Sequence, residues 1–168
     1  IGIGAPNGNY YKGTIEYAPN LNWKGVIPLT DIVTKKFKLP SALTNDANAA
    51  AVGEMMYGAA KGMKDFIMIT LGTGVGSGIV ANGQLIYGHD GFAGELGHTI
   101  VLPGGRLHWG TGALGSLEAY ASATGVVLTA KEFLETRKGE ASLLRDIKEE
   151  KLNSKTIYEA AVKKDKIA

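Results

Sequence analysis

A glycine-rich run, Gly72-Thr-Gly-Val-Gly-Ser-Gly78, directly follows a fully apolar segment, Phe66–Leu71. The apolar segment has the length and composition of a buried strand. Because glycine has no side chain, the run lets backbone amides come close to another group, and an anion such as phosphate is one such group. Close packing against another part of the protein would explain the same glycines equally well. The run therefore predicts a strand followed by a tight turn and leaves its purpose open.

Two familiar phosphate-binding loops are excluded by the residues around this run. It lacks the Gly-Lys-Ser/Thr ending of a Walker A loop. A dinucleotide-binding loop opens a helix, whereas here Asn82-Gly83, the favoured pair for a type I′ turn, joins the strand-like segments Ile79–Ala81 and Leu85–Tyr87. What remains is a strand–turn–strand phosphate hairpin, the kind used in actin-like ATPases and sugar kinases.

The rest of the chain alternates between strand and helix patterns, which favours an α/β fold. Strands are predicted at Ile1–Ala5, Thr14–Tyr17 and Leu39–Leu43. Helices are predicted at Leu29–Phe37, Ala47–Ala60, Leu117–Ala123, Val126–Arg137 (with a Thr129–Glu132 capping box) and Lys155–Lys164. A domain break is expected near Gly62, where a helix ends and a buried strand is about to begin.

Composition narrows the class of protein. The chain has 168 residues, of which 45% are hydrophobic and 20% charged, as in globular proteins. Its net charge of +2 is too small to argue for a nucleic-acid partner. No apolar run approaches the roughly 20 residues of a membrane helix. The absence of cysteine excludes disulfides and thiolate metal sites and is compatible with a cytoplasmic protein.

Both ends of the chain resemble interior sequence. It opens with Ile1-Gly-Ile-Gly-Ala-Pro6, which has the character of a core strand, and closes within a helical pattern that has no stop signal. We therefore expect further sequence on both sides. The charged run Lys131–Lys166 mixes both signs and is expected to form solvated helix faces.

Asp46 stands where a predicted strand ends and a predicted helix begins. Its carboxylate could cap the helix by accepting hydrogen bonds from first-turn amides. It could instead act as a general base that accepts a proton from a substrate hydroxyl. Asn45 could cap the same helix, so the local sequence leaves the choice open.

Glu95 and His98 lie three residues apart, and Glu118 follows later in the chain. A carboxylate, an imidazole and a second carboxylate could together bind the vicinal hydroxyls of a sugar. Each could also be an ordinary surface or satisfied buried residue. A metal site is a weaker reading, because His89, His98 and His108 form no closely spaced ligand pair.

Taken in order, these motifs resemble the ROK family of sugar kinases and sugar-responsive repressors over nearly the whole chain. The motifs are Gly4-Ala-Pro6, Pro19-Asn-Leu-Asn-Trp23, Asn45-Asp-Ala-Asn-Ala-Ala-Ala51 with Gly53-Glu54, Leu71–Val80, Gly88, Gly94-Glu-Leu-Gly-His98 and Gly115-Ser-Leu-Glu118 with Ala119–Ser122. The resemblance implies an actin-like, ribonuclease H-like fold of two lobes. Residues 1–62 would be the later part of the first lobe, and residues 63–168 the earlier part of the second.

The resemblance also implies phosphorylation of a hexose hydroxyl by ATP with Mg²⁺, with glucose to glucose 6-phosphate as the leading reaction. Asp46 would be the catalytic base. The sugar's other hydroxyls would be bound by Asn45, Glu95, His98 and Glu118, and the phosphates by Gly72, Thr73 and Gly74. Other hexose substrates that fit the resemblance are N-acetylmannosamine, fructose and allose. The intact protein is expected to be a homodimer.

Three departures from the family pattern limit this reading. The first phosphate motif and part of the adenosine pocket are missing, so we expect the chain alone to be inactive. Many members hold a structural zinc with one His and three Cys; His98 matches the histidine, but Trp109, Thr111 and Ser116 stand at the cysteine positions. We therefore expect no structural zinc, and expect burial of Trp109 to hold the loop Leu102–Gly115. Asn7 replaces a common Gly, which would alter the sugar pocket.

A sugar-responsive transcriptional repressor of the same fold is the alternative function. Such members carry a helix-turn-helix before the kinase-like region, and only in that case is nucleic acid an expected partner. A base at Asp46 favours the kinase, because a protein that only binds sugar has no need of one.

Overall fold

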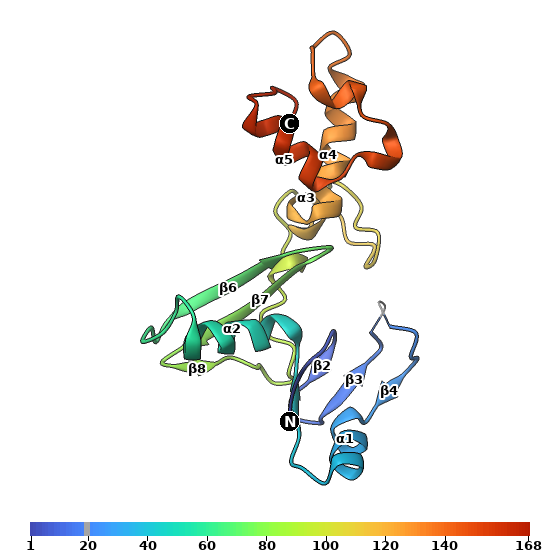
Figure 1. The fold of residues 1–168 in the computed structure, drawn as a ribbon. Coiled ribbons are helices and arrows are strands. Elements are labelled where there is room, and N and C mark those ends of the chain that lie inside the picture. Colours follow the sequence, from blue (N-terminus) through green and yellow to red (C-terminus); the bar gives the residue numbers. More distant parts are fainter. Residues whose placement is uncertain (19–20) are drawn as a thin grey trace. The chain divides into compact units, whose positions relative to one another are not determined.

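The computed structural model describes residues 1–18 and 21–168, which form two compact units (Figure 1). Unit 1 consists of Ile1–Thr70 and Gly76–Glu95, and unit 2 of Leu71–Val75 and Leu96–Ala168. The motif predicted at Pro19–Trp23 begins with residues 19 and 20, which lie outside the described residues. The lobe boundary near Gly62 concerns the whole protein's fold and stays a prediction.

Unit 1 is built on small sheets. Strands β1 (Gly2–Gly4) and β5 (Ala42–Thr44) are parallel, with Ile3 opposite Leu43. A parallel pair requires a crossover connection, and that connection carries helix α1 (Leu29–Phe37). It also carries an antiparallel sheet of β2 (Gly8–Asn9), β3 (Thr14–Glu16) and β4 (Val26–Ile27). A further sheet has the order β6 (Phe66–Leu71), β7 (Val75–Ala81) and β8 (Gln84–Leu85).

The turn between β7 and β8 is the one that its sequence predicts. Asn82 has a φ of 52° and Gly83 a φ of 73°, the two left-handed residues that a type I′ turn requires. The Asn82 amide donates to the Asp65 carboxylate at 2.9 Å, and the Gly83 amide donates to the Lys64 carbonyl at 2.7 Å. The glycine run therefore leads into strand β7 and not into a helix, which confirms the exclusion of a dinucleotide-binding loop.

Helix α2 (Asp46–Tyr57) packs closely on β7 because both contact surfaces carry small residues. A Cβ added at Gly78 would lie 2.6 Å from the Cβ of Ala51, and one added at Gly76 would lie 2.9 Å from the Cβ of Ala47. Real Cβ atoms do not approach so closely. Two glycines of the run are therefore required by helix packing, which is the alternative that the sequence left open for them.

The helices of unit 2 follow the predicted pattern with one correction. They are α3 (Glu118–Ala121), α4 (Ala123–Thr136) and α5 (Ser154–Val162), with short 3₁₀ segments η1 (Leu96–His98), η2 (Leu143–Asp146) and η3 (Glu149–Lys151). The predicted capping box at Thr129–Glu132 is wrong. Ser122 caps α4 by accepting from the Gly125 amide at 3.0 Å, and Thr129 lies inside the helix.

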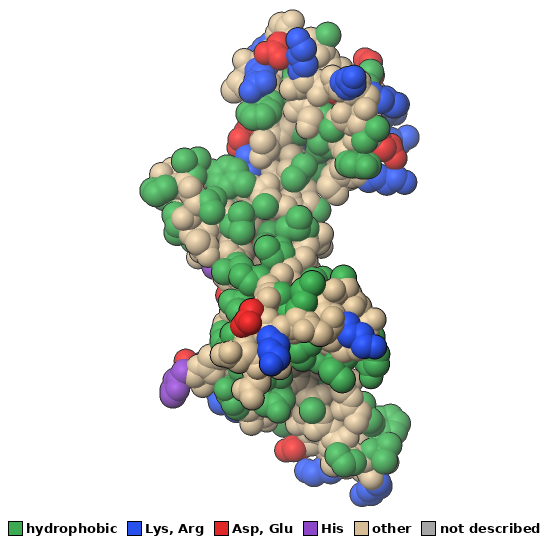
Figure 2. Space-filling model, turned by 90° about the vertical axis from the view of Figure 1, so that its left-hand side faces the viewer, with side chains coloured by type: hydrophobic (Ala, Val, Ile, Leu, Met, Phe, Trp, Pro, Cys, Tyr) green, Lys and Arg blue, Asp and Glu red, His purple; other side chains and the backbone are tan. Residues whose placement is uncertain are grey.

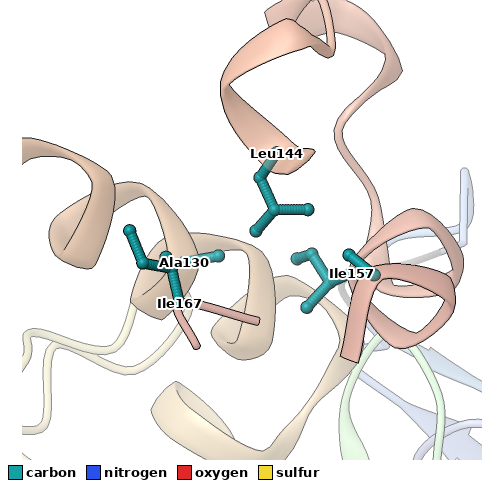
Figure 3. Close-up of a cluster of buried hydrophobic side chains, with 5 residues drawn as sticks. Ala130, Leu144, Ile157 and Ile167 are labelled. Atoms are coloured by element: carbon teal, nitrogen blue, oxygen red, sulfur yellow. The ribbon is translucent and has the colours of Figure 1, made fainter. Parts of the chain in front are cut away.

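Each unit has its own small apolar core. In unit 1 it consists of Ala5, Ile15, Ala18 and Leu43. In unit 2 the side chains of Ala130, Leu144, Ile157 and Ile167 converge from α4, η2, α5 and the last residues of the chain (Figure 3). Ala160 completes this cluster.

Asp165 joins the last residues of the chain to the start of η2 through hydrogen bonds. Its carboxylate accepts from the amides of Leu143 (2.5 Å), Ile167 (2.9 Å) and Ala168 (3.1 Å) and from the Ser142 hydroxyl (3.1 Å). Burial favours the neutral form of Asp165, but these donors favour the carboxylate and hold its pKa below the usual value.

The surface agrees with the predicted solvated helix faces. Figure 2 shows Lys and Arg side chains, with a few acidic ones among them, over the helical end of unit 2. Most charged residues between Lys131 and Lys166 are exposed, as predicted. No helix in the described part of the chain is long and apolar enough to cross a membrane.

Candidate functional site

The N-terminus of α2 carries Asn45 and Asp46, and the cap is Asn45. The Asn45 Oδ1 accepts from the amides of Ala47 at 2.8 Å and Asn48 at 3.4 Å. Asp46 is the first helical residue, and its side chain is exposed. Its Oδ1 accepts from the Ala47 amide at 3.0 Å. The reading of Asp46 as the helix cap is therefore wrong.

The capping of α2 by Asn45 determines which groups of Asn45 and Asp46 can bind a ligand. Since the oxygen of Asn45 is used by the helix, its amide NH₂ is the group with which it can donate to a ligand. The carboxylate of Asp46 is left exposed to accept a proton or a hydrogen bond. The backbone supports the arrangement, because Gly4 packs on the first turns of α2, where an added Cβ would lie 3.0 Å from the Cβ of Ala49.

Asn7, where the resemblance predicts a glycine, has a backbone conformation that favours glycine. Its φ is 51°, a left-handed value that Asn tolerates better than most residues. The Asn7 side-chain amide donates to the Glu16 carbonyl at 3.0 Å, and the Glu16 amide donates to the Asn7 carbonyl at 3.1 Å. The substitution is therefore accommodated locally, while its effect on a sugar pocket stays a prediction.

Hydrogen bonds to residues of the α3–α4 region hold the turn Gly72–Gly74 in unit 2. The Gly72 carbonyl accepts from the Ala123 amide at 2.9 Å, and the Val75 amide donates to Oε2 of Glu118 at 2.6 Å. Within the described residues, the amides of Thr73 and Gly74 donate no hydrogen bond. These amides are donors that an anion could use, so the turn fits a phosphate group.

Gly72 and Gly74 differ in what a side chain at each position would contact. A Cβ added at Gly74 would lie 2.5 Å from Oε2 of Glu118, so any larger residue there would displace the carboxylate. A Cβ added at Gly72 would meet nothing within 4 Å. No protein atom explains Gly72, which leaves room for an approaching ligand.

Glu118 is fixed by a histidine that the sequence did not single out for this role. His108 Nε2 lies 2.6 Å from Oε1 of Glu118, and the His108 side chain is only 3% exposed. The other ring nitrogen, Nδ1, accepts from the amide of Thr111 at 3.0 Å and lies 2.9 Å from its hydroxyl. Ten residues separate His108 from Glu118, and no local periodicity signals such a pair.

The loop Leu102–Gly115 is held by polar contacts rather than by Trp109. Trp109 is 48% exposed, so the expectation that its burial holds the loop is wrong. Its ring lies over the ring of His108, with centroids 4.6 Å apart. The Arg106 guanidinium donates to the carbonyls of Ala119 (2.6 Å) and Gly125 (3.0 Å), the hydroxyl of Thr129 (2.9 Å) and the carboxylate of Glu132 (2.7 Å).

Glu95 directly precedes the short segment η1, and His98 is the last residue of that segment. Both are exposed. The preceding Gly94 has a φ of 89°, and its carbonyl accepts from the Ser77 hydroxyl. The ring of His98 is nearly perpendicular to that of His108, at a centroid distance of 5.8 Å. Asn45, Asp46 and Glu95 thus belong to unit 1, and His98, Glu118 and Gly72–Gly74 to unit 2.

Two of the residues at the expected zinc positions take part in hydrogen bonds within the chain. Thr111 bonds to His108, and the buried Ser116 accepts from the Ala119 amide at 3.4 Å. No group of three His, Cys, Asp or Glu side chains in the described part of the chain could hold a metal ion. A separate depression, between α4, η2 and η3, is lined by residues such as Leu134 and Arg145 and contains none of the candidate residues.

The comparisons with known proteins point to one family. The profile of the ROK family matches residues 1–168. A glucokinase of Halalkalibacterium halodurans is 43% identical over 169 residues, covering 100% of this chain and 51% of the relative. A xylose repressor of Caldicellulosiruptor bescii is 40% identical over 136 residues, covering 80% of this chain and 33% of the repressor.

A solved structure agrees with the sequence matches. The ROK glucokinase of Streptomyces griseus, crystallised with glucose and AMPPNP, superposes with a TM-score of 0.80 at 41% identity. The match covers 99% of this chain and 54% of that one. The chain therefore has the mixed α/β, actin-like fold that its motifs predicted, and it spans about half the length of the curated glucokinase it matches.

Proposed function

Because this chain belongs to the ROK family, we propose that the intact protein transfers the γ-phosphoryl group of ATP to a hexose hydroxyl. Glucose is the leading substrate, since glucokinases are among its relatives. N-acetylmannosamine, fructose and allose are the alternative sugars. We further propose that the intact protein is a homodimer that works in the cytoplasm.

One observation carries this proposal. Asp46 presents an exposed carboxylate at the start of α2, and the capping of that helix is done by Asn45 instead. A carboxylate that caps a helix has its oxygens committed to backbone amides. Among the described residues, the Asp46 side chain accepts one hydrogen bond, from the Ala47 amide, so it retains the capacity to accept from a substrate hydroxyl.

The remaining candidates divide into two kinds of contact. Sugar hydroxyls would be bound by the Asn45 amide, the Glu95 and Glu118 carboxylates and the His98 ring. Phosphate would be bound by the amides of Thr73 and Gly74, with Gly72 keeping the approach open. Mg²⁺ would offset phosphate charge, and we assign it no ligand here because the described residues contain no metal-binding cluster.

In the proposed reaction, the protein contributes mainly by positioning the reacting groups and by stabilising charge. The sugar hydroxyl oxygen bonds to the γ-phosphorus, the bond from that phosphorus to ADP breaks, and the hydroxyl proton passes to Asp46. The carboxylate orients the hydroxyl before transfer and takes its proton during or after it. Fixed sugar contacts hold the other hydroxyls in place.

A sugar-responsive repressor is the second candidate. The similarity to a xylose repressor supports it, because the match covers most of this chain at nearly the same identity. Such a protein would bind a sugar through the same hydroxyl contacts without requiring a base.

The test is an ATP-dependent assay of the intact protein on a panel of hexoses, with Asp46→Asn beside it. We expect Asp46→Asn to lower kcat by about 100-fold or more, because general bases contribute about 10²–10⁴. Sugar affinity and stability should change little, since Asn45 still caps the helix. Asp31→Asn is the matched control, because Asp31 is an exposed acid in the first turn of α1.

The outcomes separate the candidates. Turnover that collapses in Asp46→Asn but not in Asp31→Asn supports the kinase and the role of Asp46. Full activity of Asp46→Asn would remove Asp46 as the base. Sugar binding without turnover on any hexose would favour the repressor.

A further inference from the structure

His108 occupies a buried position that gives each of its ring nitrogens a distinct partner. Nδ1 faces the amides of Gly110 at 3.3 Å and Thr111 at 3.0 Å. An amide can only donate, so Nδ1 must be the unprotonated acceptor. The ring proton is therefore on Nε2, which lies 2.6 Å from Oε1 of Glu118. The loop geometry thus selects the tautomer that donates to Glu118.

The Glu118 carboxylate is held at both oxygens. Oε1 accepts from His108, and Oε2 accepts from the Val75 amide at 2.6 Å. Hydrogen bonds to a charged carboxylate are short and strong, and two on different oxygens fix the plane of the group. A carboxylate offers about four lone-pair directions. Two are used here, and the side chain remains 15% exposed, so its remaining directions can accept from a ligand.

We propose that His108 is a positioning residue, which fixes the Glu118 carboxylate for the hydroxyls of the sugar. This rests on the proposed function, in which Glu118 contacts the substrate. The loop supports His108 in turn through Thr111 and through Trp109, whose ring packs against the imidazole. The chain contains no cysteine, so these contacts order the loop without a thiolate-bound metal.

Two substitutions of His108 test the hydrogen bonds of its two ring nitrogens separately. In His108→Gln, the side-chain amide nitrogen can reach the place of Nε2 and still donate to Glu118. In His108→Asn, the side-chain oxygen takes the place of Nδ1, so the loop amides keep an acceptor while Glu118 loses its donor. The exposed His89, whose side chain is 98% exposed beside Asp90, provides the control pair His89→Gln and His89→Asn.

Glucose affinity, kcat and melting temperature would be measured on the intact protein. We expect His108→Asn to weaken glucose binding about tenfold while its melting temperature stays near that of the wild type. We expect His108→Gln to bind glucose within about threefold of the wild type, and both His89 variants to be unchanged. Equal glucose affinity in His108→Asn and wild type would overturn the proposal and leave His108 with a structural role in the loop alone.

A second measurement does not depend on the sugar. Hydrogen exchange of the Val75 amide reports whether Glu118 still accepts from it. Exchange should accelerate in His108→Asn and stay slow in His108→Gln. Unchanged exchange in both variants would overturn the proposal even if glucose does not bind. If exchange responds as expected but no hexose binds to the wild type, the positioning of Glu118 stands and the proposed kinase function falls.

Discussion

Gly74→Ala is the most direct test of the contact between the glycine turn and Glu118. The added Cβ would lie 2.5 Å from Oε2 of Glu118, so the carboxylate must move and release the Val75 amide. A hydrogen bond to a charged group contributes about 1.5–3 kcal/mol. Replacing glycine by alanine returns about 0.4–1 kcal/mol through the unfolded state. We therefore expect the free energy of unfolding to fall by about 1–2 kcal/mol.

Gly72→Ala is the matched control for this substitution. Its added Cβ would meet no atom within 4 Å, so its stability should stay within about 0.5 kcal/mol of the wild type. Both variants would be unfolded in urea, and the KM for ATP and for glucose would be measured for each. If the phosphates approach Gly72, that variant raises the KM for ATP without losing stability. Equal stability of the two variants would refute the contact between Gly74 and Glu118.

Three further substitutions test other contacts. Gly78→Ala places a Cβ 2.6 Å from that of Ala51, and we expect chemical denaturation to show a loss of about 1–3 kcal/mol. Arg106→Lys keeps the charge but loses the planar set of donors, so we expect a loss of about 2–4 kcal/mol by the same measurement. Asp165 has a lowered pKa, so its carboxylate stabilises the fold at neutral pH and that contribution is lost as pH falls through the lowered pKa. Melting curves should therefore show Asp165→Asn less stable than wild type near neutral pH, with the difference shrinking in acid.

Local patterns were sufficient for most of the helices and strands. The helix Leu29–Phe37 and the strand Phe66–Leu71 have the predicted bounds, because side-chain spacing and apolar runs act over a few residues. The turn at Asn82-Gly83 is equally local, since only a few residue types adopt two successive positive φ values.

The capping of helices was less predictable. Thr129 and Glu132 have the spacing of a capping box, yet α4 already runs continuously from Ser122. Asn45 and Asp46 are both capping residue types, and the choice depends on which one has the extended backbone before the helix. Asn45 has it, with a ψ of 149°. A sequence pattern does not specify that angle.

The candidate residues could be predicted from the sequence, but the hydrogen-bond partners that hold them in place could not. The motifs and the resemblance pointed to Glu118. Its partners are His108, ten residues away with no local period that signals the pair, and the amide of Val75, which is distant in sequence. Burial of Trp109 was expected to hold the loop in place of a structural zinc. The loop instead buries the smaller His108, whose two nitrogens both find partners there.

The bonds of Arg106 have a consequence for how the loop Leu102–Gly115 can move. The guanidinium is one rigid plane that joins the loop to the start and the second turn of α4, so its bonds are lost together rather than one at a time. We therefore expect the loop to open in a single step, with its amides exchanging at the rate of the first turns of α4. For the same reason, we expect the loop to be fixed and not to act as a lid. Under the proposed function, any motion that admits or releases a sugar would have to carry α4 with it or arise elsewhere in the protein.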